Sequence, residues 1–313
     1  MNIQQLRYLH EIARRGLNVS EAAAALFTSQ PGVSKQVRLL EEELGVTIFE
    51  RSGKRLIGVT EPGQQVLEIV ARMLDDAKNL KRVGDEYSDE GSGALDIATT
   101  HTQARYVLPP VVKQFMTRFP KVRLRLHQGN PAQVAEWVLR GDADIGIATE
   151  ALDHYSQLVA LPCYQWSHTV VVPQGHPLLA VSALPIVELG RYPLITYDPS
   201  FTGRGRIDRA FERAGVIPNI VLTAVDSDVI KTYVELGLGV GVIAEMAFDP
   251  ARDTALAAVA AGHLFETNTT RLAIKRSNWL RRFDYDFIEL FAPQLSRKLV
   301  ETSLRGGRED PGL

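Results

Sequence analysis

A run of hydroxyl and amide side chains stands out near residue 100. It reads Thr99-Thr100-His101-Thr102-Gln103, and it separates an apolar stretch typical of a strand from a segment with helical periodicity. The first N–H groups of a helix attract anions, and the side chains of Thr100, Thr102 and Gln103 add hydrogen-bonding groups. Because the run contains no lysine or arginine, it would hold a sulfate-like anion through neutral dipoles. Simple helix capping is the alternative interpretation.

A second set of polar side chains repeats at helical spacing between residues 29 and 41. Its hydrogen-bond donors follow i, i+4 and i+8 spacing, with one lysine beside them: Gln30, Ser34, Arg38 and Lys35. The opposite side is apolar: Val33, Val37, Leu40 and Leu44. A recognition helix in the major groove of DNA needs this division, and Ser29 and Pro31 suit its first turn. An ordinary amphipathic surface helix is the alternative.

The elements around this helix complete a winged helix-turn-helix pattern. Residues 4–14 have helical periodicity, and a second helix is expected to begin at Ser20 as its N-cap, before a short turn at residues 27–28. Residues 49–57 are typical of a hairpin with a Ser-Gly turn. The cations of this hairpin would neutralise DNA phosphates: Arg51, Lys54 and Arg55. A solvated basic loop is the alternative for the hairpin.

A linker helix is expected after Thr60, which is a good N-cap. Its apolar residues alternate four and three apart, as in a coiled-coil seam: Val66, Val70, Met73, Ala77 and Leu80. Dimerisation through this seam would place two recognition helices about one DNA turn apart. A helix that packs within one chain is the alternative. Residues 84–93 are polar and contain glycine, which indicates a hinge.

From residue 95 onward, short apolar runs alternate with helical segments. Strands are expected at 95–98, 122–126, 145–148, 169–172, 194–196, 221–223 and 272–274, and helices at 106–119, 134–139, 206–213, 228–236 and 283–291. This order predicts two α/β lobes with mostly parallel sheets. Ligands bind such sheets at the carboxyl ends of their strands, in the cleft between the lobes.

Composition limits the possible classes of protein. The 313 residues suggest about two domains. The net charge of −2 gives no signal for nucleic-acid binding, so such a signal must come from local clusters of charge. The single cysteine, Cys163, excludes an internal disulfide and is interpreted as a small buried hydrophobe. We expect a cytoplasmic protein without membrane contact, because neither a secretory signal nor a membrane-spanning run is present.

No catalytic constellation is present in the sequence. The glycines of residues 237–241 have the wrong spacing for a dinucleotide-binding loop, and a tight helix-to-strand turn explains them. No Gly-x-Ser-x-Gly elbow or phosphate-binding loop occurs. The histidines show no metal-ligand spacing with cysteine or carboxylate residues. The sequence therefore predicts neither an enzyme nor a metal site.

The stretch from Leu6 to Gly63 resembles the N-terminal domain of LysR-type regulators. The resemblance lies in residues 17–23, 29–37, 40–45, 48–51 and 59–63. Almost the whole second part resembles the CysB family of these regulators, in residues 97–106, 127–129, 147–152, 201–204 and 228–234. Residues 197–200 depart from the pattern of that family. The resemblance implies regulation of sulfur assimilation, either cysteine biosynthesis or sulfonate use.

The resemblance also implies a ligand site and partners. The ligand residues it implies are Thr100, Thr102, Gln103, Thr149 and Thr202. They would bind a sulfate- or thiosulfate-like anion or N-acetylserine or O-acetylserine, with no cofactor. The expected partners are double-stranded promoter DNA, RNA polymerase and further copies of the chain in a homotetramer. A LysR-type regulator of another pathway and a solute-binding receptor are the alternatives.

The expected fold class is therefore α/β overall. Its N-terminal part is a largely α-helical winged helix-turn-helix with a linker helix, and its C-terminal part resembles a periplasmic binding protein. The expected boundaries are 1–60 for DNA binding, 61–91 for linker and hinge, 92–305 for effector binding and 306–313 for a tail. Lobe I would hold 92–161 and 269–300, and lobe II would hold 162–268.

Overall fold

The computed structural model describes residues 1–53, 55–88, 92–201 and 203–306. The chain divides into two compact units, Met1–Gly84 and Asp85–Leu313. Among the described residues, none of the helices combines the length and apolar character needed to cross a lipid bilayer.

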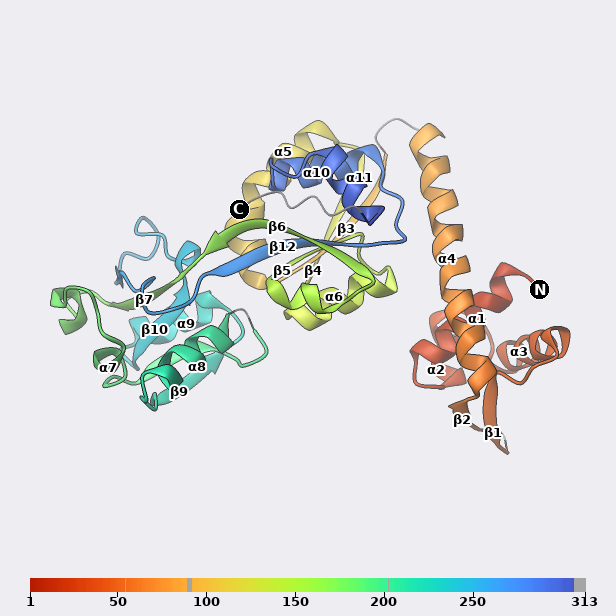
Figure 1. Ribbon diagram of the computed structural model, residues 1–313, viewed down its shortest axis with the longest axis horizontal. Coiled ribbons are helices and arrows are strands. Elements are labelled where there is room, and N and C mark those ends of the chain that lie inside the picture. The colour runs from red at the N-terminus through yellow and green to blue at the C-terminus, as the bar shows by residue number, and fades with distance from the viewer. Residues whose placement is uncertain (54, 89–91, 202, 307–313) are drawn as a thin grey trace. The chain divides into compact units, whose positions relative to one another are not determined.

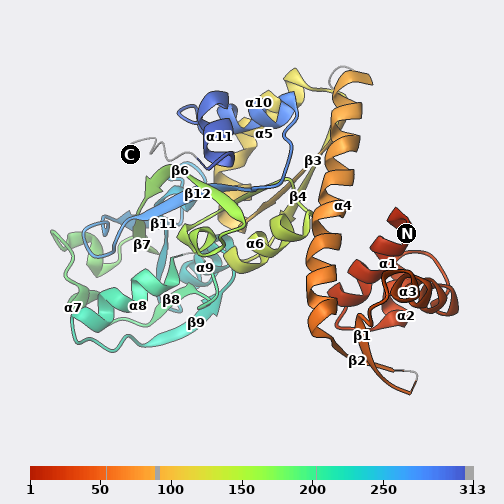
Figure 2. The same cartoon turned by 45° about the vertical axis from the view of Figure 1, so that its right-hand side comes forward.

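The first unit consists of three short helices, a hairpin and the start of a long helix (Figure 2). Its elements are α1 (Ile3–Arg14), α2 (Val19–Ala25), α3 (Gln30–Leu44), β1 (Phe49–Ser52), β2 (Arg55–Val59) and α4 (Glu61–Ser88), which continues into the second unit. Fully buried apolar side chains from all three short helices and the hairpin form one core, among them Leu9, Val33, Leu40 and Phe49. This confirms the predicted winged helix-turn-helix architecture.

Helix α2 begins earlier than predicted. Asn18 is its N-cap, because its side-chain oxygen accepts hydrogen bonds from the N–H groups of Ser20 and Glu21, each at 3.1 Å. The prediction of Ser20 as the N-cap was therefore wrong. Both residue types cap helices well, so the sequence alone does not separate them.

The predicted seam of α4 divides into two sets. The hydroxyl oxygen of Thr60 accepts a hydrogen bond from the N–H of Gly63 at 3.0 Å, as expected of a cap. Val70 is buried in the core of the first unit. Met73 and Leu80 are 40% and 75% exposed in the single chain. Only the exposed set is therefore available to a second copy.

The second unit contains two five-stranded sheets. The first has the order β4-β3-β5-β12-β6 and consists of β3 (Gly93–Thr99), β4 (Val122–Gln128), β5 (Ile145–Ala148), β6 (Leu158–Trp166) and β12 (Asn268–Lys275). Strand β3 is parallel to β4 and β5, and β12 is antiparallel to β5 and β6. One face carries α5 (Leu108–Arg118), α10 (Arg282–Phe291) and α11 (Arg297–Leu304), and the other carries α6 (Pro131–Arg140) (Figure 1). Short helical turns lie at η1 (Gln103–Val107) and η2 (Glu150–His154).

The second sheet has the order β11-β7-β10-β8-β9. Its strands are β7 (His168–Pro173), β8 (Leu194–Tyr197), β9 (Ile220–Ala224), β10 (Val240–Ala244) and β11 (Leu256–Val259). The helices of this lobe are α7 (Ile186–Leu189), α8 (Arg204–Arg213) and α9 (Ser227–Glu235), with short turns at η3 (Pro177–Ala180) and η4 (Glu245–Ala247). Each sheet has its own buried core, which confirms the predicted two-lobed α/β class. The prediction of mostly parallel sheets was wrong, because β7 and β12 are antiparallel to both of their neighbours.

Two segments cross between the lobes. Strand β6 leads directly into β7, and β12 returns beside β6 (Figure 1). The predicted turn at residues 237–241 is confirmed, since Gly237 has a φ of +75° and a Cβ on Gly239 would lie 2.5 Å from the Pro193 carbonyl oxygen. Cys163 is buried in the first lobe, where burial raises the pKa of its thiol to about 12.

Candidate DNA-binding and ligand-binding sites

Helix α3 has the two-sided character that a recognition helix needs. The hydroxyl oxygen of Ser29 accepts a hydrogen bond from the N–H of Gly32 at 3.3 Å and caps the helix. Val33 and Val37 are buried against the other helices of the first unit. The amide of Gln30 donates to Ser34 at 3.1 Å on the opposite face. The polar face of α3 is thus presented away from the core.

Most of the predicted DNA-binding residues line one hollow of about 460 Å³. They are Gln30, Pro31, Ser34, Lys35, Arg38 and Arg51. Leu39, Glu42 and Gly53 complete its lining. Ser29 and Arg55 are also exposed, but they do not line the hollow. Lys54 lies outside the described residues.

Arg51 has a structural partner that the sequence did not reveal. Its guanidinium donates to the Glu41 carboxylate at 2.5 Å. The same carboxylate accepts the N–H groups of Ile48 and Phe49 at 2.9 and 3.1 Å. Glu41 therefore connects the end of α3 to the hairpin through these three hydrogen bonds, one of which comes from Arg51.

The predicted anion-binding run lies at the carboxyl end of β3. Thr100, Thr102 and Gln103 are all buried, with exposures of 1%, 2% and 1%. The Thr100 hydroxyl is buried, and it has no hydrogen-bond partner within the described part of the chain. Buried hydroxyls are almost always hydrogen-bonded, so this group is available to a ligand.

The Gln103 amide is held by the two crossing segments. Its nitrogen donates to Thr270 Oγ1 at 3.2 Å, and its oxygen accepts a hydrogen bond from the Tyr164 hydroxyl. Trp166 donates from its indole nitrogen to the same Thr270 oxygen at 3.1 Å. These contacts fix the orientation of the Gln103 amide.

Thr102 of the first lobe forms a side-chain hydrogen bond with Tyr197 of the second lobe. The Tyr197 hydroxyl lies 2.6 Å from Ser227 Oγ and accepts the Ala244 N–H at 2.8 Å. Burial raises the pKa of Tyr197 to about 12, while hydrogen bonds with Ser227, Ala244 and Thr102 partly oppose that rise. The two lobes thus bring hydroxyl groups to one place.

The two remaining predicted ligand residues are Thr149 and Thr202. Thr149 is buried after β5, and its side chain makes no capping hydrogen bond to η2. Thr202 lies outside the described residues. Its neighbour Gly203 precedes α8 with a φ of +72°.

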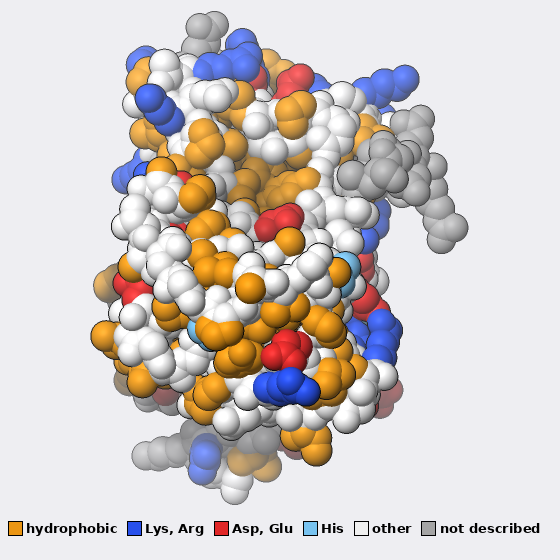
Figure 3. All heavy atoms as spheres, turned by 90° about the vertical axis from the view of Figure 1, so that its left-hand side faces the viewer, with side chains coloured by type: hydrophobic (Ala, Val, Ile, Leu, Met, Phe, Trp, Pro, Cys, Tyr) orange, Lys and Arg blue, Asp and Glu red, His pale blue; other side chains and the backbone are white. Residues whose placement is uncertain are grey.

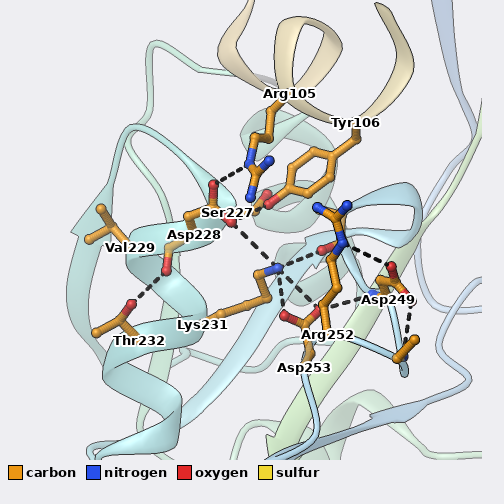
Figure 4. Close-up of polar contacts among 12 residues, drawn as sticks. Arg105, Tyr106, Ser227, Asp228, Val229, Lys231, Thr232, Asp249, Arg252 and Asp253 are labelled. Atoms are coloured by element: carbon orange, nitrogen blue, oxygen red, sulfur yellow. Dashed lines mark hydrogen bonds and ion pairs between the residues drawn. The ribbon is translucent and has the colours of Figure 1, made fainter. Parts of the chain in front are cut away.

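A cluster of charged side chains around Asp228 forms contacts between the two lobes (Figure 4). The Asp228 carboxylate accepts hydrogen bonds from the Tyr106 hydroxyl at 2.6 Å and from Arg105 Nε at 3.1 Å. Lys231 Nζ lies 3.5 Å from the same carboxylate and 2.9 Å from Asp253. Sequence analysis did not predict this cluster, because it joins residues more than a hundred positions apart.

Three potential metal ligands also meet at this place. One ligand atom each from His101, Asp226 and Asp228 lies within 4.8 Å of the others. Asp226 already caps α9, by accepting the Val229 N–H at 2.9 Å. The cations beside Asp228 oppose binding of a further cation, so this cluster is better explained by contact between the lobes.

A helix-turn-helix unit followed by a two-lobed α/β unit with polar groups at its strand ends defines a ligand-responsive DNA-binding regulator. Residues 3–64 match the model of the bacterial regulatory helix-turn-helix proteins of the lysR family, and residues 88–296 match the LysR substrate binding domain. The chain belongs to the LysR family of transcriptional regulators. This confirms the prediction that it is a regulator and not an enzyme.

Individual relatives cover nearly the whole chain. The HTH-type transcriptional regulator SsuR of Burkholderia cenocepacia is 55% identical, over 97% of this chain and 99% of its own length. The HTH-type transcriptional regulator CysB of the same organism is 52% identical, over 99% of both chains. The crystal structure of the cofactor-binding domain of the Cbl transcriptional regulator has 46% identity and a TM-score of 0.67, and the match covers 70% of this chain and 96% of that domain.

Proposed function

We propose that this regulator controls genes of sulfur assimilation and reads sulfur supply through a ligand between its two lobes. The ligand is a sulfate- or thiosulfate-like anion, N-acetylserine or O-acetylserine. The observation that carries the proposal is the buried, unpartnered hydroxyl of Thr100 beside Thr102 and Gln103. The likeness to SsuR, CysB and the Cbl domain supports the pathway.

The chemistry of this site suits an anion that must also be released. Threonine hydroxyls and an amide donate hydrogen bonds without a net charge. A neutral set of donors keeps affinity moderate, so occupancy follows the concentration of the metabolite. Thr149 and Thr202 complete the proposed set.

The DNA partner is double-stranded promoter DNA. We assign base contacts to Gln30, Ser34 and Arg38, and phosphate contacts to Lys35 and Arg55. Ser29 and Pro31 place the first turn of α3, and Lys54 and Arg51 belong to the basic hairpin. Because promoters are chromosomal, the regulator acts in the cytoplasm, and RNA polymerase is its partner there.

Oligomerisation is part of the proposal. The exposed Met73 and Leu80 of α4 would pair two chains. Figure 3 shows hydrophobic side chains gathered on the end of the second unit that carries β7 and β10. Ile217, Leu236 and Leu238 of the same lobe are 93%, 67% and 51% exposed. A second contact through the second unit would make the homotetramer.

The test is calorimetric titration of the full-length protein with sulfate, thiosulfate, N-acetylserine and O-acetylserine. Saturable binding of one of them to the wild type, weakened at least about tenfold in Thr102→Ala, is the expected result. Thr117→Ala is the matched control, because its hydroxyl bonds only to the Lys113 carbonyl on the surface of α5.

DNA binding is then followed with and without that ligand. We expect a changed affinity, footprint or bend for the promoters of sulfur-assimilation genes, because an allosteric ligand must bind the two states unequally. No binding of any of the four compounds would refute the sulfur proposal and leave a regulator with another ligand.

A further inference from the structure

A buried polar pair lies beside the proposed ligand site. His168, at the start of β7, and Asn268, at the start of β12, are each 1% exposed. Neither ring nitrogen of His168 and neither amide atom of Asn268 has a hydrogen-bond partner among the residues that the structure describes. Four orphaned polar atoms in one place are rare in a folded protein, and they indicate a ligand.

Strand neighbours place this pair next to the site. His168 is opposite Ala244 in the sheet, and the N–H of Ala244 donates to Tyr197. Asn268 is opposite Trp166, whose indole shares the Thr270 oxygen with Gln103. The pair therefore lies next to residues that both lobes supply to the proposed site, Gln103 from one lobe and Tyr197 from the other.

The N-terminus of α8 closes over the pair. A Cβ on Gly203 would lie 2.7 Å from the His168 ring and 2.9 Å from Asn268 Oδ1. Any larger residue would clash with the pair, and the φ of +72° also favours glycine. The rings of Trp166 and Phe265 hold the imidazole edge-on, with centroids 5.2 and 5.4 Å away.

We infer that His168 and Asn268 form a subsite for an uncharged group with both a hydrogen-bond donor and an acceptor, such as the amide or hydroxyl of a small organic acid. This inference rests on the proposed function. It assigns the organic part of the ligand to this pair and the anionic part to Thr100, Thr102 and Gln103. The subsite therefore selects an acetylated amino acid over an inorganic anion.

The chemistry of the pair supports this selection. Burial, together with the positive charge of Arg206, lowers the pKa of His168 to about 3. The ring is therefore neutral at physiological pH and offers one donor and one acceptor, as the Asn268 amide does. A sulfate ion only accepts hydrogen bonds, so it would face repulsion from the two acceptor atoms.

The test compares two probes, N-acetylserine and sulfate, by calorimetric titration of the full-length protein. The variants are His168→Phe, which keeps a ring between Trp166 and Phe265, and Asn268→Ala. We expect each variant to bind N-acetylserine at least about tenfold more weakly and sulfate within about threefold of wild type. His168→Gln, which restores a donor and an acceptor, should recover part of the affinity for N-acetylserine.

Thermal unfolding separates this role from a structural one. Replacing buried unpartnered polar atoms by apolar ones does not destabilise a fold, so His168→Phe should unfold at or above the wild-type temperature. Asn278→Ala is the matched control, because Asn278 also has a buried amide nitrogen without a partner but lies after β12, away from the site. It should leave both affinities unchanged.

The outcomes distinguish the two proposals. If the wild type binds N-acetylserine and the variants bind it equally well, the subsite is refuted and the proposed function stands. Equal weakening of both probes, or wild-type binding of sulfate alone, also refutes the subsite. If the wild type binds neither N-acetylserine nor sulfate, the result counts against the proposed ligand class itself.

Discussion

The hydroxyl of Tyr106 donates a 2.6 Å hydrogen bond to Asp228, and this bond joins the segment after β3 to the first turn of α9 in the other lobe (Figure 4). Burial raises the pKa of Tyr106, and the hydrogen bond to Asp228 raises it further. Burial alone would raise the pKa of Asp228 as well. Hydrogen bonds from Tyr106 and Arg105 and the charge of Lys231 outweigh that effect and hold it below its usual value. The bond therefore joins a neutral phenol to a carboxylate over the whole physiological pH range.

Removing this bond should weaken ligand binding. In Tyr106→Phe the two lobes lose a charge-assisted contact, and the half-buried carboxylate keeps Arg105 and Lys231. We expect a loss of about 1 kcal/mol, or roughly fivefold in affinity for the ligand found by titration. Tyr233→Phe, on the same helix as Asp228, is the control. Equal affinity of Tyr106→Phe and wild type would show that the bond does not bias the lobes toward the bound arrangement.

Arg38 and Arg51 should differ in what their loss affects. Arg38 lines the hollow of the recognition helix and is exposed. Arg38→Ala should weaken specific DNA binding by ~1–3 kcal/mol and leave the unfolding temperature unchanged. Arg7→Ala, an exposed arginine of α1 outside the hollow, is the control for a general loss of charge. Fluorescence anisotropy with operator and unrelated DNA makes the comparison.

Arg51→Ala should also destabilise the first unit. Glu41 would lose its guanidinium partner and keep only two backbone donors. Because Arg51 is partly exposed, we expect a modest loss of about 1 kcal/mol in the free energy of unfolding. Chemical denaturation followed by circular dichroism measures it. An Arg51→Ala variant as stable as wild type would show that Glu41 holds the hairpin through its backbone contacts alone.

The exposed side of α4 should control oligomerisation. Met73 and Leu80 face away from the core of their own chain, so a charge there costs little in the monomer and much in a coiled coil. Met73→Glu with Leu80→Glu should give dimers in place of tetramers in sedimentation velocity, because the contact through the second unit remains, and should reduce affinity for a pseudo-palindromic site. Met116→Glu on α5 is the control, since this residue is 39% exposed and belongs to neither proposed contact. Tetramers of the double variant as stable as those of the wild type would place the contact between paired chains outside α4.

Helices and strands with periodic side-chain patterns were predictable from the sequence. The position of each element in the fold was not. The polar and apolar sides of α3 follow from side chains three and four residues apart, which is local information. Strand β6, which contains Pro162, was not predicted. Proline is tolerated there since β6 is an edge strand with a bulge at Cys163, directly after the proline. Position in the sheet, which decides this, is not visible in the strand itself.

The candidate site shows the same division. Thr100, Thr102 and Gln103 form one continuous run, so a single segment suggested an anion site. Their partners come from strands and helices that only the topology brings near, among them Tyr164, Tyr197, Ser227 and Thr270. His168 and Asn268 are 100 residues apart and have no local pattern, and their missing partners are visible only in three dimensions.

The buried His168 should make stability depend on pH. Its pKa is lowered by burial to about 3 in the folded state, whereas an unfolded histidine titrates near 6.5. Between these values the unfolded chain binds a proton that the folded chain excludes, so the free energy of unfolding falls as the pH decreases below about 6.5. At pH 5 this amounts to about 2 kcal/mol relative to neutral pH. His168→Phe should remove that part of the pH dependence, as measured by urea denaturation at pH 7.5 and pH 5. The exposed His154, changed to Gln, is the control. Parallel pH profiles for His168→Phe and wild type would mean that the ring gains a proton, or a compensating partner, in the folded protein.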